Sequence, residues 1–349
     1  MFLAWHEIRR NRLKFSLIIG ILVLISYLLF LLSGLAKGLI NMNTEGIQQW
    51  HANAIVLNKN ANRTIEQSRF NKAWVDGKFD QQVSLKETRV IISNGKIKDN
   101  VLLYGTEPQA WMIPKLIEGR LFEKRHEVVA DRTLKEKGFK IGDHLSLSQS
   151  NETLTIVGFS QSAKFNAAAV LFGNAQTIEG INPTLADPQI NAVVVKDKDW
   201  NQHKLNSQLE IIDIDTFIEG LPGYKAQNLT LNFMISFLFA ISATVIAVFL
   251  YVMTLQKVTL FGVLKAQGFT NGDLARVVMA QTLILALIGT GIGLLLTLLT
   301  ARLLPSAVPI QFDWFHLSVF GLILIFVSLL GSLFSILTIR KIDPLIAIG

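Results

Sequence analysis

The sequence contains no cysteine and little charge. Of its 349 residues, 17% are charged. The lack of cysteine excludes disulfide scaffolds, thiolate metal sites and cysteine nucleophiles. The nucleotide-binding pattern G-x-x-x-x-G-K-[ST] is also absent, so this chain cannot hold ATP phosphates in a P-loop. Six histidines are present without metal-ligand spacing, and we expect the protein itself to bind no metal. With no catalytic constellation left, the chain is predicted not to be an enzyme.

Apolar residues dominate what is there. The chain is 50% hydrophobic, with 22 Phe against 4 Tyr, which is too apolar for a soluble domain of this size. Four segments have the length of about 20 residues that matches a hydrocarbon core of roughly 30 Å. None contains a charged residue or a histidine, which argues against a pump or channel for small ions. The four segments are Leu17–Leu35, Leu231–Met253, Val277–Leu299 and Leu317–Ile339.

Charge placement predicts the orientation. Residues 40–228 carry equal numbers of basic and acidic side chains, so the whole net charge of +7 lies in the remainder. If the chain crosses four times, most of the remaining basic residues lie on the side that holds both termini. The positive-inside rule then predicts a multi-pass protein of the cytoplasmic cell membrane with both termini in the cytoplasm. Because these charges adjoin apolar spans, nucleic-acid binding is disfavoured. They are Arg9, Arg10, Arg12, Lys14, Lys257, Lys265, Arg276, Arg340 and Lys341.

The spans divide the chain into four parts. The first apolar segment follows basic residues, as a signal peptide would, but its run is longer and three more spans follow. We therefore interpret it as an anchor. Its preceding arginines are expected to hold an amphipathic helix on anionic headgroups, with an ATPase contact as the alternative. The predicted parts are a cytoplasmic N-terminal amphipathic helix (1–15), a first transmembrane helix (16–39), an extracytoplasmic domain (40–228), and three transmembrane helices with a cytoplasmic coupling loop at 255–276 (229–349).

The pattern of residues 40–228 predicts an α+β domain. Val90–Ile92 and Val101–Tyr104 are apolar runs on either side of Asn94-Gly95, which favours a tight hairpin turn. The stretch from His126 to Ser160 indicates a strand, a helix that stops at Gly138, and two further strands. The predicted fold class is therefore an α-helical membrane protein with four transmembrane helices and an α+β extracytoplasmic domain between the first and second.

The loop between the second and third spans has its own structure. The second span is predicted to run on from Gln256 into a short amphipathic helix, with apolar residues at Val258, Phe261, Val263 and Leu264, an interruption at Gly262 and an end at Gly268. Thr270 and Asp273 form a capping-box pattern that starts the next helix. Such a stiff element suits docking into a groove on a partner protein. A helix lying on lipid headgroups is the alternative interpretation.

Small residues inside the spans predict close packing. Gly34 and Gly38 form a G-x-x-x-G pattern in the first span, and Gly289, Gly291 and Gly293 lie in the third. Although the last three could be mistaken for a dinucleotide fingerprint, they lie in an apolar span. There, glycines allow helices to approach closely.

The motifs resemble one family over nearly the whole chain. The loop and third span, "KVTLFGVLKAQGFTNGDLARVVMAQTLILALIGTGIGLLLTLL", and the ending "RKIDPLIAIG" resemble the permease subunits of the MacB/FtsX class of ABC transporters. In the outer region, "EGRLF" and "EVVADRTLKEKGFKIGDHLSL...LTIVGFS" are similar to the core-domain signature of that class. Within the class, "SGLAKGL", "LYVMTLQKVTLFGVLKAQGF" and "KIDPLIAIG" most resemble the HrtB haem-export permeases.

The resemblance implies a mechanism. Permeases of this class form a homodimer with two copies of a separate ABC ATPase, so ATP would be bound by the partner and no cofactor by this chain. Closure of the ATPase pair would push the coupling loop and move the spans and outer domains, which is mechanotransmission. Substrate would enter sideways from the outer leaflet, in keeping with the charge-free spans. The residues implied in ATPase coupling are Lys257, Phe261, Gly262, Leu264, Lys265 and Ala266.

Haem is the substrate implied by the closest branch, and haem requires a side-chain ligand and apolar walls. Met42 and Glu45 are three residues apart and can share a helical face. The alternative for Met42 is packing against lipid, and for Glu45 a solvated charge. His51 fits no pattern of the branch. The candidates near the outer ends of the first two spans are Met42, Glu45, His51, Tyr224, Phe233 and Met234.

Two other functions remain open from the sequence. One is a non-transporting lever of the FtsX kind, which activates a cell-wall hydrolase outside the cell. Permeases of that kind usually have a longer cytoplasmic N-terminus and a smaller outer domain than this chain. The other is a permease that releases lipoproteins or glycolipids, with a similar topology but normally a periplasmic acceptor.

Overall fold

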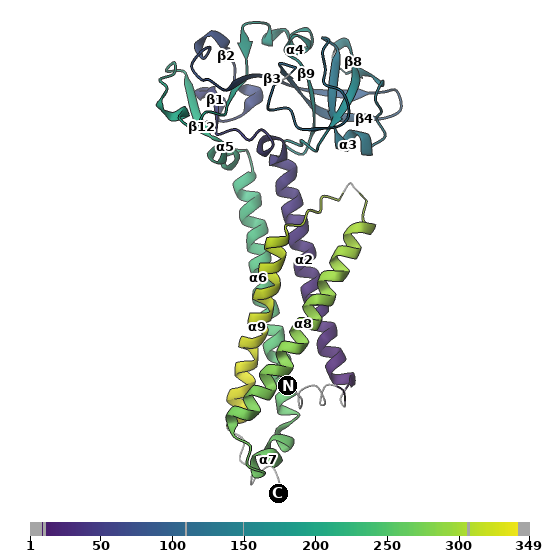
Figure 1. The fold of residues 1–349 in the computed structure, drawn as a ribbon, viewed down its shortest axis with the longest axis vertical. Coiled ribbons are helices and arrows are strands. Elements are labelled where there is room, and N and C mark those ends of the chain that lie inside the picture. Colours follow the sequence, from purple (N-terminus) through teal and green to yellow (C-terminus); the bar gives the residue numbers. More distant parts are fainter. Residues whose placement is uncertain (1–8, 10–11, 109, 149, 306–307, 341–349) are drawn as a thin grey trace. The chain divides into compact units, whose positions relative to one another are not determined.

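The computed structural model describes residues 9, 12–108, 110–148, 150–305 and 308–340, which form two compact units (Figure 1). The first, called here the helical unit, comprises Met1–Gly38 and Leu229–Gly349. The second, called the sheet domain, comprises Leu39–Asn228. Each unit is described separately below.

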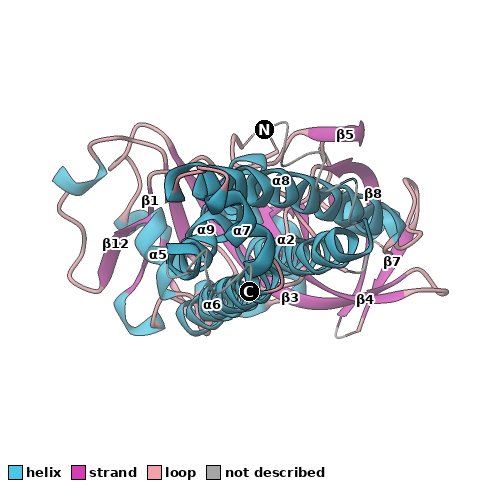
Figure 2. Ribbon diagram, turned by 90° about the horizontal axis from the view of Figure 1, so that it is seen from below, coloured by secondary structure: helices cyan, strands magenta, loops and turns pink. Residues whose placement is uncertain are grey.

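Long helices make up the helical unit, and Figure 2 shows them nearly end-on. Among the described residues, four helices are long and apolar enough to cross a membrane, and each expected span lies within one of these helices. Helices α2 and α6 continue into residues of the sheet domain. The predicted N-terminal helix at 1–15 lies mostly outside the described residues, as does the ending after Arg340. The helices are α2 (Arg12–Gln48), α6 (Tyr224–Leu255), α7 (Val258–Ala266), α8 (Asn271–Leu303) and α9 (Trp314–Arg340).

The sheet domain is built on a 10-stranded mixed sheet with the order β12-β1-β11-β3-β4-β9-β6-β8-β5, and β7 pairs with β3 and β8. The pairs β4–β9 and β6–β8 are parallel. A separate two-stranded sheet joins β2 (Phe70–Asn71) to β10 (Gln189–Ile190). The main strands are β1 (Ala54–Asn58), β3 (Gln82–Ser93), β4 (Lys98–Thr106), β5 (Leu116–Gly119), β6 (Glu127–Asp131), β7 (His144–Leu147), β8 (Ser150–Ser160), β9 (Ala169–Asn174), β11 (Ala192–Val195) and β12 (Leu209–Asp213).

The predicted fold class is confirmed, with four membrane-spanning candidates and an α and β domain between the first and second. The hairpin is also confirmed. β3 and β4 pair from Ser93 and Lys98 onward, and Gly95 at the turn has a φ of 86°. In the following segment, β6 leads into helix α3 (Arg132–Glu136), and Gly138 follows with a φ of 104°.

Alternation along β3 produces two hydrophobic cores, because successive side chains point to opposite faces of a sheet. On one face, Val83 and Leu85 pack with the end of α2 and with helix α5 (Ile214–Gly220). On the other face, Val90 and Ile92 pack with Leu134 of α3 and with helix α4 (Ala175–Ile181).

The two outer-region motifs meet at Gly119 and Gly158 and at an ion pair. Gly119 has a φ of 79°, and a Cβ there would lie 2.3 Å from the carbonyl oxygen of Val157. Next to it, the Arg120 guanidinium donates to both carboxylate oxygens of Glu127, at 2.5 and 2.8 Å. This contact and two backbone N–H donors lower the pKa of Glu127 to about 2. The motif residues therefore hold the β5–β6 connection in place.

Close packing between α2 and α8 is confirmed at two of the predicted glycines. A Cβ on Gly289 would lie 2.5 Å from Leu22 Cβ, and one on Gly293 would lie 2.0 Å from Ser26 Oγ. The hydroxyl of Ser26 donates to the carbonyl of Gly289 at 3.2 Å. Gly291 differs, because no atom of the described residues lies within 4 Å of its Cβ position.

The prediction that Gly34 and Gly38 serve the approach of another helix is wrong. Both glycines contact the connection between α8 and α9 instead. A Cβ on Gly38 would lie 1.9 Å from the carbonyl oxygen of Pro309, and one on Gly34 would lie 2.4 Å from the Phe312 ring. The backbone N–H of Gln311 donates to the Gly34 carbonyl at 3.1 Å. A G-x-x-x-G pattern exposes backbone on one helix face, and here the α8–α9 connection takes that space.

The α2–α8 contact predicts that Gly293→Ala destabilises the protein, because the added methyl group overlaps Ser26 and the backbone nitrogen of Tyr27. Overpacking of this kind costs about 1–3 kcal/mol. The check is thermal unfolding of the purified protein in detergent. Gly291→Ala is the matched control, since it adds the same methyl group in the same helix where nothing is close. Equal unfolding temperatures for the two variants would contradict the packing described.

Candidate functional site

The corner between α6 and α8 is the first candidate site. Helix α6 ends at Leu255, a turn at Gln256 and Lys257 follows, and α7 is a separate helix. The second span therefore ends before α7, whereas the sequence predicts that it runs on into this helix. Gly268, with a φ of 97°, ends the corner, and Thr270 and Asp273 form the predicted capping box at the start of α8.

The predicted interruption at Gly262 is wrong, since α7 is continuous from Val258 to Ala266. Glycine in a helix interior costs about 1 kcal/mol, which packing can offset. The packing comes from Phe261, which is 2% exposed and lies against Leu274 and Val278 of α8. Gly262 is buried beside it.

The packing of α7 changes which residues face outward. Phe261 was predicted as part of a docking face, but it is buried within the chain, and Leu264 packs partly against the same cluster. Ala266 is exposed and Lys265 is partly exposed. The large apolar side chains that this corner presents outward are Leu260, Val263 and Phe269, which are 47%, 38% and 37% exposed.

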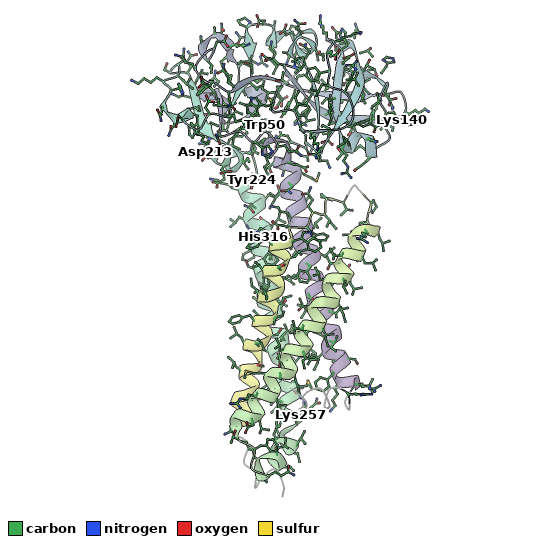
Figure 3. The ribbon with its side chains drawn as sticks, in the orientation of Figure 1. Trp50, Lys140, Asp213, Tyr224, Lys257 and His316 are labelled. Atoms are coloured by element: carbon green, nitrogen blue, oxygen red, sulfur yellow. The ribbon has the colours of Figure 1, made fainter. Side chains whose placement is uncertain are left out.

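Lys257 turns into the helical unit. Its ammonium lies 5.0 Å from the centre of the Phe15 ring of α2, and its Nζ donates to Oε1 of Gln281 of α8 at 3.3 Å. Figure 3 labels this side chain at the α7 end of the helices. Lys257 therefore joins three elements of the helical unit, α2, the α6–α7 turn and α8.

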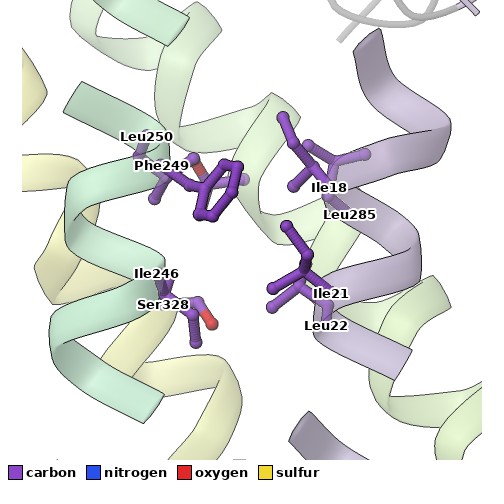
Figure 4. Close-up of a pocket in the computed structure, with 9 residues that line it drawn as sticks. Ile18, Ile21, Leu22, Ile246, Phe249, Leu250, Leu285 and Ser328 are labelled. Atoms are coloured by element: carbon purple, nitrogen blue, oxygen red, sulfur yellow. The ribbon is translucent and has the colours of Figure 1, made fainter. Parts of the chain in front are cut away.

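An apolar pocket lies between the helices above this corner (Figure 4). Ile18 and Leu22 of α2 face Ile246 and Phe249 of α6 across it. A second pocket, lined by Phe15, Lys257 and Gln281 among others, shares lining residues with the first. The shared residues are Leu250, Thr282 and Leu285.

At the other end of α2, Met42 and Glu45 contact the loop after β8. The hydroxyl of Ser162 donates to Oε2 of Glu45 at 2.7 Å, and the N–H of Ala167 donates to the Met42 carbonyl at 3.1 Å. Both side chains are half-buried. Glu45 is therefore partly enclosed, and its carboxylate is hydrogen-bonded to a loop of the sheet domain.

His51 and Tyr224 are placed separately. His51 is exposed and has a φ of 47°, in the turn that follows α2. Tyr224 begins α6 and packs against the core of the sheet domain that contains Trp50. Among the described residues, no group of three or more His, Cys, Asp or Glu side chains is arranged to hold a metal ion.

Phe233 and Met234 lie on the exposed surface of α6, 68% and 45% exposed. Phe233 stacks on Phe237 with ring centres 6.1 Å apart. Both residues belong to the helical unit, whereas the other four substrate candidates belong to the sheet domain.

Helix α6 carries a stripe of exposed residues that was not predicted from the sequence, although their spacing is visible there. Exposed residues recur along the helix at alternating intervals of three and four, which is the spacing of a helix–helix seam. The most apolar stretch of α6 is also less buried than that of the other three long helices. In α6, 17% of the residues in this stretch are buried, against 33% in each of the others. The stripe consists of Met234, Phe237, Ile241, Thr244, Val248, Tyr251 and Leu255.

The full length of this chain, and parts of it, are similar to known proteins. The FtsX-like permease C-terminal family matches residues 232–344. Hemin transport system permease protein HrtB of Staphylococcus epidermidis is 27% identical over 352 residues, covering 100% of this chain and 99% of that protein. The HrtB protein of Staphylococcus haemolyticus is 24% identical over 351 residues, with the same coverage. The crystal structure of the periplasmic region of MacB from Actinobacillus actinomycetemcomitans is 16% identical, covers 49% of this chain and 92% of that one, and has a TM-score of 0.36.

Proposed function

We propose that this chain, an ABC permease of the MacB/FtsX class near the HrtB permeases, is the membrane subunit of an ATP-driven exporter that removes haem or a similar amphipathic molecule from the membrane. The observation that carries the proposal is the match to HrtB proteins, whose name assigns hemin transport, over the full length of both chains. The charge-free spans support an amphipathic cargo, because an ion path through hydrocarbon usually needs ionisable groups.

Energy is proposed to enter at α7. Because the sequence has no P-loop, we propose that a separate ATPase supplies hydrolysis, in two copies for a permease dimer. The corner supports this role in two ways. Its inner side is held by Phe261 against α8, which makes it stiff, and its outer side presents Leu260 and Val263 to a partner groove. In this proposal the corner and both termini face the cytoplasm, in line with their basic residues.

Two copies of the chain are proposed to meet along the α6 stripe. The 3-4 spacing allows side chains of two α6 helices to interdigitate, and low coverage of α6 by its own helical unit leaves that face open. Closure of the ATPase pair would move the two α6 helices together. Cargo would then leave sideways, between the first and second spans of the two protomers.

Contacts to haem are proposed for the candidates of each unit taken separately. Met42 would act through its sulfur and Phe233 and Met234 through apolar contact, because haem requires an axial ligand and apolar walls. Glu45 is a weaker candidate ligand than Met42, because its carboxylate already accepts the Ser162 hydroxyl. His51 and Tyr224 remain candidates by position alone.

Haem is expected to stimulate ATP hydrolysis by the permease reconstituted with its ATPase in lipid vesicles. Met42→Ala is expected to raise the haem concentration for half-maximal stimulation by about tenfold, equivalent to 1.4 kcal/mol. The measurement is phosphate release against haem concentration. The matched control is Met279→Ala, because Met279 lies on the exposed surface of α8. Met112→Ala would not serve, because Met112 is buried in the sheet domain. Stimulation by a lipopeptide but not by haem would reject the haem assignment and favour lipoprotein release, while the permease class would stand.

Leu260→Asp is expected to uncouple the ATPase from transport, because a carboxylate in an apolar groove loses hydration without a partner. Co-purification of the ATPase and haem-stimulated hydrolysis are the two readouts, and both should fall. The matched control is Leu303→Asp, which makes the same change at a 77% exposed position. Leu303 lies at the end of α8 that is farther along the chain from α7. Normal coupling in Leu260→Asp would mean that the ATPase does not dock on α7.

Val248→Cys is expected to form a disulfide-linked dimer in native membranes, because the α6 stripe would bring the two copies of this residue together. The chain has no natural cysteine, so each variant carries a single thiol. Non-reducing gel electrophoresis after mild oxidation provides the measurement. Leu295→Cys, 67% exposed on α8, is the control that should stay monomeric. Equal cross-linking of the two variants would count against α6 as the dimer seam.

A further inference from the structure

We propose that a buried polar cluster in the sheet domain, formed by Trp50, Glu87, Tyr104 and Thr106, is a proton-operated latch on the end of α2. With Glu87 neutral, the latch holds Trp50 in the core. Loss of the Glu87 proton loosens the core around Trp50. The inference concerns the sheet domain alone and does not depend on the substrate or the ATPase.

The four side chains lie in one hydrophobic core. Glu87 and Tyr104 face each other in the register of β3 and β4, and Thr106 is two residues further along β4 on the same face. Trp50, labelled in Figure 3, lies in the turn after α2. Its ring centre is 6.2 Å from that of Tyr104. Trp50 is 1% exposed and Tyr104 is fully buried, so this cluster sits where α2 joins the sheet domain.

Among the described residues, each member has a buried polar atom with no partner at ordinary hydrogen-bond distance. These atoms are Trp50 Nε1, Glu87 Oε2, Tyr104 Oη and Thr106 Oγ1. Buried polar atoms in folded proteins are nearly always paired, with protein or with water. An N–H donor, two hydroxyls and a carboxyl group in one core can pair among themselves or through a buried water molecule if the carboxyl is neutral.

The neutral form of Glu87 is the one that fits this core. Burial raises the pKa of Glu87 to about 8, and the negative charge of Glu66 adds to the effect. The Tyr104 hydroxyl, which faces Glu87 from β4, lowers the pKa of Glu87, and Arg89 on the same strand lowers it further. Burial raises the pKa of Tyr104 itself. An ionised carboxylate in this core would lack a buried cation.

Deprotonation therefore acts on stability in a defined direction. The folded pKa of about 8 lies above the ordinary value of 4.5, so the folded protein binds more protons than the unfolded chain between these values. Stability from Glu87 is complete below pH 4.5, falls as pH rises, and is lost above about pH 8. Just above neutrality, the latch is open in a growing fraction of molecules.

Infrared titration of the full-length protein in lipid nanodiscs tests the latch directly. A protonated buried carboxyl gives a C=O stretching band distinct from that of a carboxylate. We expect this band in wild type at pH 6, its loss with a midpoint near pH 8, and its absence from Glu87→Gln. A wild-type protein with no such band, or a band that persists in Glu87→Gln, would overturn the proposal.

Stability and hydrogen exchange test the consequence for α2. Between pH 6 and pH 9, the unfolding temperature of the sheet domain in wild type should fall by roughly 5 °C, and that of Glu87→Gln should not. Amide exchange at residues 47–50 should rise over the same range only in wild type. Glu127→Gln is the matched control, because Glu127 is ionised throughout this range and its variant should keep the wild-type pH response. Unchanged exchange at 47–50 in wild type would show that Glu87 does not hold α2.

Discussion

The helical unit depends on one constraint, which is that hydrocarbon offers polar groups no partner. Its spans contain hydroxyls rather than charges, and these donate within the protein. Thr282 donates to the Val278 carbonyl at 3.0 Å, and Ser328 to the Leu324 carbonyl at 2.7 Å. At the close contact between α2 and α8, the Ser26 hydroxyl donates to the Gly289 carbonyl. The same constraint disfavours a polar tunnel through these charge-free spans.

Local sequence signals were sufficient for elements that depend on neighbouring residues alone. The spans follow from run length, the hairpin from Asn94-Gly95, and the start of α8 from the capping box at Thr270. The order of the sheet could not be predicted in this way, because pairings such as parallel β4 with β9 join residues far apart in the chain. No periodicity within a strand identifies its partner.

The candidate site shows the same division. An apolar pattern on α7 was visible, but its direction was not, because Leu274 and Val278 of α8 determine which face of α7 is covered. Glycines at positions 34 and 38 marked a close approach without saying that the α8–α9 connection makes it. Glu87 stands in the sequence "LKETRV", where it resembles a surface charge on a strand. Only the position of Trp50 and Tyr104 in the folded domain shows that it is enclosed.

The contacts at the end of α2 have a mechanical consequence. Met42, Glu45, Gly46 and Gln49 recur at helical spacing along one side of α2, and all four contact the loop that follows β8. That loop is in turn fixed to β6, because the Ala163 N–H donates to the buried carboxylate of Asp131. Within the sheet domain, the last turns of α2 are therefore fixed to this loop at several points along one side of the helix. Rotation of these turns about the helix axis would strain their hydrogen bonds to the loop, and through the loop it would act on β6 and β8.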